Sequence, residues 1–292
     1  KKISELFETI FGQKINVSTM SSINDEMEVK LEPSIEVIKA SLIESKTIHS
    51  DETSIRINAI THWVHVVCNS LWTWIYPHKQ RGAEAMNSDH GILKKCKNNM
   101  VHDCWGSYFD FEDATHILCN AHLLRELQKL KEAGSQWAKQ MIDFMLNIYA
   151  ETKANPKDPT ILTNKEDCYK KYVNICNIGL KEEPTPLKTG KRGRTKKSKG
   201  LNLLERMIKY KDGILAFAFD LNIPFTNNWA ENDLRKVKIK QKVSQCFRTF
   251  KGAENYTTIE SFISTLKKQK RNVWAEFIAL FSQEKYCYNP FS

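Results

Sequence analysis

The sequence predicts an α/β domain: a mixed five-stranded sheet with flanking helices and a helical insertion before one late helix. Three β-rich segments, 47–57, 63–68 and 71–76, follow one another with short polar connections, which suits a meander of hairpins. Two shorter apolar segments, 99–104 and 115–119, are set apart by helical or helix-like stretches. Strands that join a sheet in parallel need such crossover connections. The pattern therefore indicates three antiparallel strands followed by two parallel ones.

Helical spacing of apolar residues accounts for most of the remaining chain. The connection between the first two strands is expected at Asn58–His62. The order of three strands, helix, strand, helix-like linker, strand and helix matches the mixed sheet of ribonuclease H-like domains. Helices are expected within 1–45 and at about 83–96, 121–131, 136–180, 201–219, 229–240, 256–268 and 273–281.

Five segments follow from this pattern. They are an N-terminal helical segment (1–45), the first part of the core (46–135), a helical insertion with a basic loop (136–214), the second part of the core with the late helix (215–265), and a C-terminal helix and tail (266–292).

The charge balance favours a polyanionic partner. Lys and Arg number 44 and Asp and Glu 34, for a net charge of +10, which points to nucleic acid before a membrane surface. No stretch approaches the roughly 18 apolar residues of a membrane span, and the N-terminus lacks the apolar run of a secretory signal. The eight cysteines form no CxxC pair, so reduced thiols in the cytoplasm are expected. The chain lacks an initiator Met, which leaves open whether upstream domains precede it.

Three acids carry the candidate chemistry. Asp51 lies in the first strand, and its neighbour Glu52 faces the opposite side of the sheet. Asp103 lies near the end of the fourth strand, at the kind of strand end where ligands collect in α/β sheets. Glu231 lies in the first turn of the late helix, which Asn227 or Asn228 is placed to cap.

Convergent carboxylates repel one another unless cations or protons neutralise them. Oxygen ligands favour Mg²⁺ or Mn²⁺, and two such ions can activate a water or a 3′-hydroxyl and stabilise the leaving oxygen of a phosphodiester. Spacing alone does not separate these three residues from the other acids of the chain.

Four segments supply a more specific signal. In chain order they are HSDET (49–53), VHDCWGSYF (101–109), HILCNAHLLREL (116–127) and PFTNNWAE (224–231), and KQKVS (240–244) with Phe247-Arg248 continues the series. These segments resemble the motifs of the insertion sequence sixty-six family of DDE transposases, and the resemblance spans most of the chain.

The resemblance implies that Asp51, Asp103 and Glu231 form a catalytic triad that binds two Mg²⁺ (or Mn²⁺) ions in a ribonuclease H-like core. It also implies double-stranded DNA as partner, both element ends and target, a homodimer or higher assembly on that DNA, and accessory proteins from the same element. The chain departs from the family at Asn232, where the family often has Arg. The family's upstream zinc-finger region is not in this chain.

Cationic side chains are candidates for contact with DNA phosphates. One group lies in the acid-free stretch 188–199, a second extends from Glu231 along the late helix, and Arg81 precedes the helix after the third strand. Exposed helix faces and solvated loops are the alternative interpretation. The predicted DNA-binding residues are Arg81, Lys191, Arg192, Arg194, Lys196, Lys197, Arg235, Lys236, Lys238, Lys240 and Lys242.

A last group is expected to support the site. His116, Cys119 and His122 offer three zinc ligands, but structural zinc normally takes four, so a packed, hydrogen-bonded role for Cys119 and His122 is preferred. Trp105, just after Asp103, is a candidate for stacking on an unpaired base. Asn227 and Asn228 complete the group through the helix cap.

The sequence therefore predicts a DNA transposase that performs metal-dependent cleavage and strand transfer at the ends of a bacterial insertion element. Two alternatives stay open: a ribonuclease H-like, structure-selective nuclease or resolvase, and a non-catalytic DNA-binding remnant of a transposase.

Overall fold

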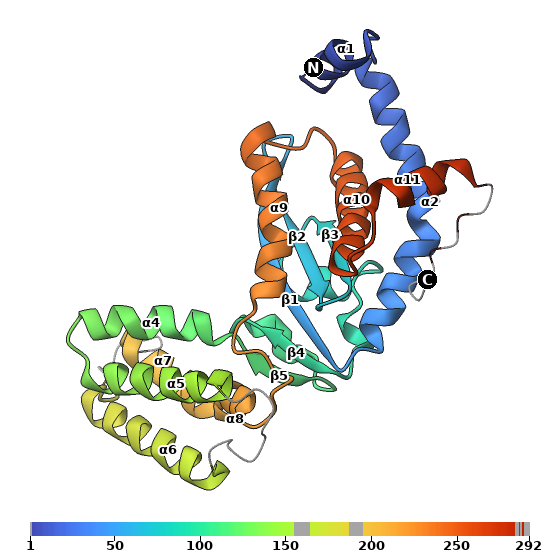
Figure 1. Cartoon of the computed structure of the whole chain (residues 1–292). Helices are drawn as coiled ribbons and strands as arrows, with labels where there is room; N and C mark the ends of the chain where they lie inside the picture. Colours follow the sequence, from blue (N-terminus) through green and yellow to red (C-terminus); the bar gives the residue numbers. More distant parts are fainter. Residues whose placement is uncertain (1, 155–163, 187–194, 284–285, 287, 289–292) are drawn as a thin grey trace. The chain divides into compact units, whose positions relative to one another are not determined.

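The computed structural model describes residues 2–154, 164–186, 195–283, 286 and 288 (Figure 1). Its sheet has five strands in the order β3-β2-β1-β4-β5 and contains both antiparallel and parallel pairs. This confirms the predicted α/β class with a mixed five-stranded sheet, consistent with a ribonuclease H-like fold.

The chain divides into two compact units. Unit 1 comprises Lys1–Asn98, Asp110–Ala114 and Asn228–Ser292, and unit 2 comprises Asn99–Phe109 and Thr115–Asn227. Among the helices of the described residues, none has both the length and the apolar character needed to cross a membrane.

Unit 1 holds the antiparallel meander and the helices around it. Its strands are β1 (Thr47–Ile57), β2 (Ile60–Cys68) and β3 (Thr73–His78). Its helices are α1 (Lys2–Phe11), α2 (Val17–Ile43), α3 (Ala83–Met86), the short 3-10 helix η1 (Leu93–Lys95), α9 (Asn228–Ser244), α10 (Phe250–Lys268) and α11 (Val273–Ser282).

Unit 2 holds the parallel pair and a group of helices. The strands are β4 (Asn99–His102) and β5 (Thr115–Leu118), with the 3-10 helix η2 (Gly106–Asp110) between them in the chain. The helices are α4 (Asn120–Glu132), α5 (Gln136–Ala154), α6 (Lys165–Glu182), α7 (Lys199–Lys209), α8 (Lys211–Leu215) and η3 (Ala216–Ala218).

The hairpin between β1 and β2 is tighter than the sequence predicted. Instead of a polar connection over Asn58–His62, only Asn58 and Ala59 form the turn, with φ of 48° and 65°, and β2 begins at Ile60. Two consecutive left-handed residues match the twist of the flanking strands. Asn adopts this conformation readily, whereas Ala is unusual there.

The helix predicted at about 83–96 was wrong in extent. The structure has α3, which ends at Met86, and the separate η1, which begins at Leu93. The intervening residues include Ser88, Asp89 and Gly91, and a Cβ at Gly91 would lie 2.1 Å from the Met86 carbonyl oxygen. Turn-forming residues and this close backbone approach explain the break.

Helix α9 packs on one face of the meander. Strand alternation places Ile55 and Ile57 on that face, and they form a buried cluster with Ala230, Leu234 and Val237 of α9. The helix lies along β1 and β2 in Figure 1. Residue Phe247, which follows α9, extends the contact because its N–H donates to the Arg56 carbonyl at 2.8 Å.

Helix α10 lies beside β3, the edge strand of the sheet (Figure 1). The Ile75 N–H donates to Ser261 Oγ at 2.8 Å, and the Thr73 N–H donates to Thr265 Oγ1 at 3.1 Å. Hydroxyl groups of a helix therefore satisfy edge-strand donors that would otherwise be unpaired.

The core of unit 2 is helical. Trp137 of α5, Tyr172 of α6 and Leu204 of α7 are buried together in one cluster. A Cβ at Gly179 of α6 would lie 3.0 Å from both Trp137 and Leu204 side chains, so glycine allows the helices to approach closely. The residues predicted as a helical insertion thus form α5 to α8 in their described part.

A buried carboxylate network fixes α9 against the meander and α10. Asp233 is 2% exposed, and its Oδ2 accepts from Thr73 Oγ1 at 2.9 Å and from Lys268 Nζ at 2.7 Å. Its Oδ1 faces Lys236 Nζ at 3.2 Å and accepts from Ser264 Oγ at 3.2 Å. Burial alone would raise the pKa of Asp233, but the ion pair and hydrogen bonds with Lys268, together with Lys236 and Thr73, lower it below the ordinary 3.8.

We predict that Asp233→Asn lowers the free energy of unfolding by about 3 kcal/mol, since it leaves the buried Lys268 ammonium without its counter-charge. Urea denaturation measures this change. Glu26→Gln is the matched control, because Glu26 is an exposed partner in an i,i+4 pair with Lys30 and such pairs contribute under about 0.5 kcal/mol. Equal effects of the two substitutions would contradict the importance of the network.

The same network predicts a pH dependence. A carboxyl whose folded pKa is depressed contributes stability above its unfolded pKa and loses it as the pH falls through the folded value. The difference in unfolding free energy between the natural protein and Asp233→Asn should therefore be constant above pH 3.8 and shrink below it. A difference that grows as the solution is acidified would have the wrong sign.

Candidate active site

Asp51 lies on the α9 face of the meander. It stands opposite Val66 of β2, which belongs to the buried cluster beneath α9, and directly opposed residues of an antiparallel pair share a face. Its Oδ1 accepts from the Glu52 N–H at 2.9 Å, and its side chain is half-buried. Alternation then sends Glu52 to the opposite face, as predicted.

Glu231 lies on α9 at about the level of Asp51 along the sheet. Lys238 Nζ of α9 donates to the Ser54 carbonyl at 2.5 Å, and Phe247, further along the chain, pairs with Ile57 in parallel. Helix and strand therefore run in the same direction. Seven helical residues from Lys238 back to Glu231 span about 10 Å, and three strand residues from Ser54 back to Asp51 also span about 10 Å.

The thiol of Cys68 is buried close to the carboxylates of Asp51 and Asp233. Burial is the largest cause that raises its pKa, and the carboxylates of Asp233 and Asp51 raise it further while Lys268 opposes them. Asp51 and Asp233 thus lie within electrostatic range of one thiol. Glu231 lies two residues before Asp233 on the same helix, so the two side chains point to different sides of α9.

Asp103 lies in unit 2, directly after β4. Its Oδ1 accepts from the Trp105 N–H at 2.8 Å, so the chain turns immediately beyond the strand. The Trp105 side chain is 39% exposed. An acid and an accessible indole therefore stand next to each other at the end of the strand.

His102, the neighbour of Asp103, is buried inside unit 2. Its ring stacks on Tyr108, and its Nε2 lies 2.9 Å from His116 Nδ1. Burial, with a contribution from His116, lowers the pKa of His102 to about 3 despite a hydrogen bond to the Asp103 carbonyl. His116 thus forms a ring pair with His102, and the packed role predicted for Cys119 and His122 stays a prediction.

Cys119 and Asn120 hold the segment that enters α9. The Asn227 N–H donates to Cys119 Sγ at 3.2 Å, and the Asn120 N–H donates to the Phe225 carbonyl at 3.1 Å. Asn227 is fully buried, and α9 begins at the next residue, Asn228. The start of α4, which also includes His122, therefore fixes the chain four residues before Glu231.

The comparison with protein-family models gives one match: the transposase IS66 family model covers residues 1–255. The chain belongs to this family. A search of curated proteins gives no match. The family resemblance predicted from the four motifs is confirmed, and this transposase-family chain carries them at the positions described above.

Arg81 of the transposase is engaged within unit 1. Its guanidinium pairs with Glu52 at 2.7 Å and lies 4.8 Å from the centroid of the Trp63 ring. The Glu52 side chain is 1% exposed, whereas that of Arg81 is 30% exposed. The cation balances a buried acid, and its predicted phosphate contact stays a prediction.

The predicted DNA-binding residues of α9 fall into two groups. Lys236 is turned inward, with its ammonium 3.2 Å from Asp233 and 3.4 Å from Glu260. The other four cations are exposed, although burial lowers the pKa of Lys238. They are Arg235, Lys238, Lys240 and Lys242.

The basic stretch is described only in part. Lys197 pairs with Glu205 at 2.7 Å, and Lys196 is exposed. Lys191, Arg192 and Arg194 lie outside the described residues.

Sequence reasoning missed Asp233 and Lys268. The signal was present, because Asp233 lies within the apolar stripe formed by Ala230, Leu234 and Val237, where an acid needs a buried partner. Its partner Lys268 is 35 residues away, and no local pattern links the two.

We predict that the His102 ring stays neutral between pH 5 and 8, since burial lowers its pKa from 6.5 to about 3. Histidine ring NMR signals across this range measure it, with the His102 signal assigned by its absence from His102→Gln. A titration midpoint near 6.5 would contradict the buried placement. Because the folded pKa is depressed, His102 contributes stability above pH 6.5 that declines toward about pH 3.

Proposed function

We propose that this protein is a DDE-type DNA transposase that cleaves and joins DNA at the ends of a bacterial insertion element. Asp51, Asp103 and Glu231 would be its catalytic carboxylates. It would act in the cytoplasm on double-stranded DNA, as a homodimer or higher assembly on paired ends.

The observation that carries the proposal is the placement of two acids from distant parts of the chain. Asp51 of β1 and Glu231 of α9 belong to the same side of unit 1 and lie at about the same level. Asp103 directly follows β4, the strand that comes after β1 in the sheet order. Membership in the transposase family gives this pair and Asp103 their expected roles.

The donor set fits Mg²⁺ or Mn²⁺, because the three carboxylates offer only hard oxygen ligands. Two bound ions would supply the activation of a water or a 3′-hydroxyl and the stabilisation of the departing oxygen. Asp51 and Asp103 would hold ions throughout the reaction, and Glu231 would complete the second site.

Other residues would position the DNA. The exposed cations of α9 follow Glu231 along the helix, so they would contact phosphates that lead away from the carboxylates. Trp105 presents an accessible ring beside Asp103 and would stack on a base. Cys119 and Asn227 would position Glu231 through the segment they anchor.

We predict that Asp51→Asn, Asp103→Asn and Glu231→Gln each reduce Mg²⁺-dependent cleavage of DNA by roughly a thousandfold or more, because bound metal contributes several kcal/mol to such reactions. Cleavage of a supercoiled plasmid carrying the element ends measures this. Binding of the same DNA in Ca²⁺ should stay within a few-fold of the natural protein.

Glu112→Gln is the matched control, because Glu112 is an exposed acid of unit 1. Cleavage without joining of ends to a new target would indicate a nuclease or resolvase. Binding without cleavage under all metal conditions would indicate a non-catalytic remnant.

We predict that the double substitution Arg235→Ala with Lys242→Ala weakens DNA binding and reduces the slope of log K against log salt by about 2, near 0.9 for each lost phosphate contact. Fluorescence anisotropy at several salt concentrations measures the slope. Thermal unfolding should be unchanged, since both side chains are exposed.

Lys236→Ala is the contrasting variant. Its ammonium contacts Asp233 and Glu260, so it should lower the unfolding temperature and leave the salt slope nearly unchanged. If the Arg235→Ala and Lys242→Ala double variant keeps the salt slope of the natural protein, α9 does not contact the DNA.

A further inference from the structure

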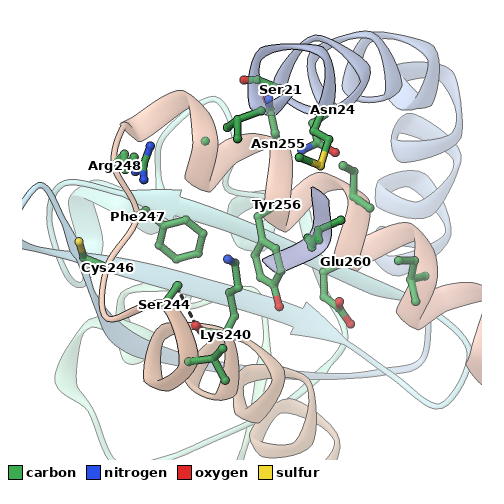
Figure 2. A pocket seen from close by; sticks show the side chains of 17 residues that line it. Ser21, Asn24, Lys240, Ser244, Cys246, Phe247, Arg248, Asn255, Tyr256 and Glu260 are labelled. Atoms are coloured by element: carbon green, nitrogen blue, oxygen red, sulfur yellow. Dashed lines mark hydrogen bonds between the residues drawn. The ribbon is translucent and has the colours of Figure 1, made fainter. Parts of the chain in front are cut away.

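Unit 1 contains a pocket of about 740 Å³ between α9 and α10 (Figure 2). It lies among α1, the first half of α2, the end of α9, the segment 245–249 and α10. Its volume falls in the range of small-molecule sites. We call it the α9–α10 pocket.

Two aromatic rings and two cations line this pocket. The rings of Phe247 and Tyr256 have centroids 5.6 Å apart at an interplanar angle of 54°. Lys240 Nζ lies 6.0 Å from the centroid of the Phe247 ring, and Figure 2 shows the ammonium directed between the two rings. Arg248 stands at another side of the pocket. Flat apolar surfaces and positive charge therefore occur together.

A buried amide in the same pocket has an unused acceptor. Asn255 is 5% exposed, and its Nδ2 donates to Asp25 Oδ1. Its Oδ1 has no hydrogen-bond partner among the described residues. A carboxylate only accepts, so the pair with Asp25 fixes which end of the amide is Oδ1. Because Oδ1 also has almost no accessible surface, this amide forms part of the pocket wall and is not open to a ligand.

We propose that the α9–α10 pocket holds one unpaired nucleotide of a DNA strand bound to unit 1. This inference rests on the proposed function, because it assumes that DNA is the substrate. The base would stack on Tyr256, and a phosphate would lie against Lys240 and Arg248.

The lining favours a nucleotide over a docked helix. An apolar helix would cover Met20, Ile259 and the rings, but it would leave Lys240 and Arg248 without an anion. A nucleotide provides a flat apolar face and a negative charge in one group.

The test compares a blunt DNA duplex with a duplex that carries a short overhang containing 2-aminopurine. Both are titrated in Ca²⁺ by fluorescence anisotropy, with 2-aminopurine emission as a second signal. The natural protein should bind the overhang more tightly and quench its emission, since stacking reduces the fluorescence of this base.

Tyr256→Leu should weaken binding of the overhang by roughly 10- to 100-fold, as expected for one lost base–aromatic stack, and leave the blunt duplex unaffected. Tyr256→Phe, which keeps the ring, is the matched control and should behave as the natural protein. Lys240→Ala should weaken binding of the overhang more than binding of the blunt duplex. This variant tests the pocket independently if Tyr256→Leu does not fold.

The outcomes separate the two proposals. Absence of binding to the blunt duplex would overturn the proposed function and this inference together. The nucleotide proposal alone would be wrong if the protein binds the blunt duplex but does not quench 2-aminopurine, and if neither Tyr256→Leu nor Lys240→Ala changes binding of the overhang. If free deoxyadenosine monophosphate competes with the overhang as well as a DNA strand does, the pocket binds a mononucleotide and not a DNA strand. A change in sedimentation of Tyr256→Leu without DNA would identify a protein interface instead.

Discussion

The buried carboxylate of Asp233 is the interaction on which the arrangement of unit 1 depends. It joins three elements, because its oxygens bind Thr73 of β3, Lys268 of α10 and Lys236 of its own helix α9. Hydrophobic contact alone would let α9 slide or rotate over the meander, whereas a buried ion pair has one satisfactory geometry. Glu231 lies two residues earlier on that helix, so the network that stabilises the fold also fixes the level of the candidate catalytic acid.

Much of the fold could be predicted from local pattern. The alternation of β1 and the apolar runs of β2 and β3 identified the meander, and the helix expected at about 229–240 from its start signals is α9 (Asn228–Ser244). The breaks were harder. Continuing the helix from α3 through η1 ignored the close approach of Gly91 to Met86, which depends on tertiary packing and leaves no periodic signal.

The candidate site followed a similar division. Motifs identified Asp51, Asp103 and Glu231, and strand alternation correctly separated Asp51 from Glu52. Charge patterning could not tell Lys236, which is internal, from the exposed cations on the same helix. Local sequence shows only approximately which side of α9 is buried. The acids that hold Lys236 inward, Asp233 and Glu260, lie near it only in the folded chain. Asn255 was equally hidden, since only the folded structure shows which of its polar atoms lacks a partner.

The hydroxyls of Ser261 and Thr265 have a consequence for how the protein can associate. They occupy the backbone donors of Ile75 and Thr73 on the outer strand of the meander, and Pro77 on that strand has no N–H to offer. A foreign strand therefore finds no row of vacant donors there, and it would have to displace α10 before it could pair. This edge is protected against intermolecular β-addition and the aggregation that begins with it, so copies of the chain at high local concentration would not polymerise through it.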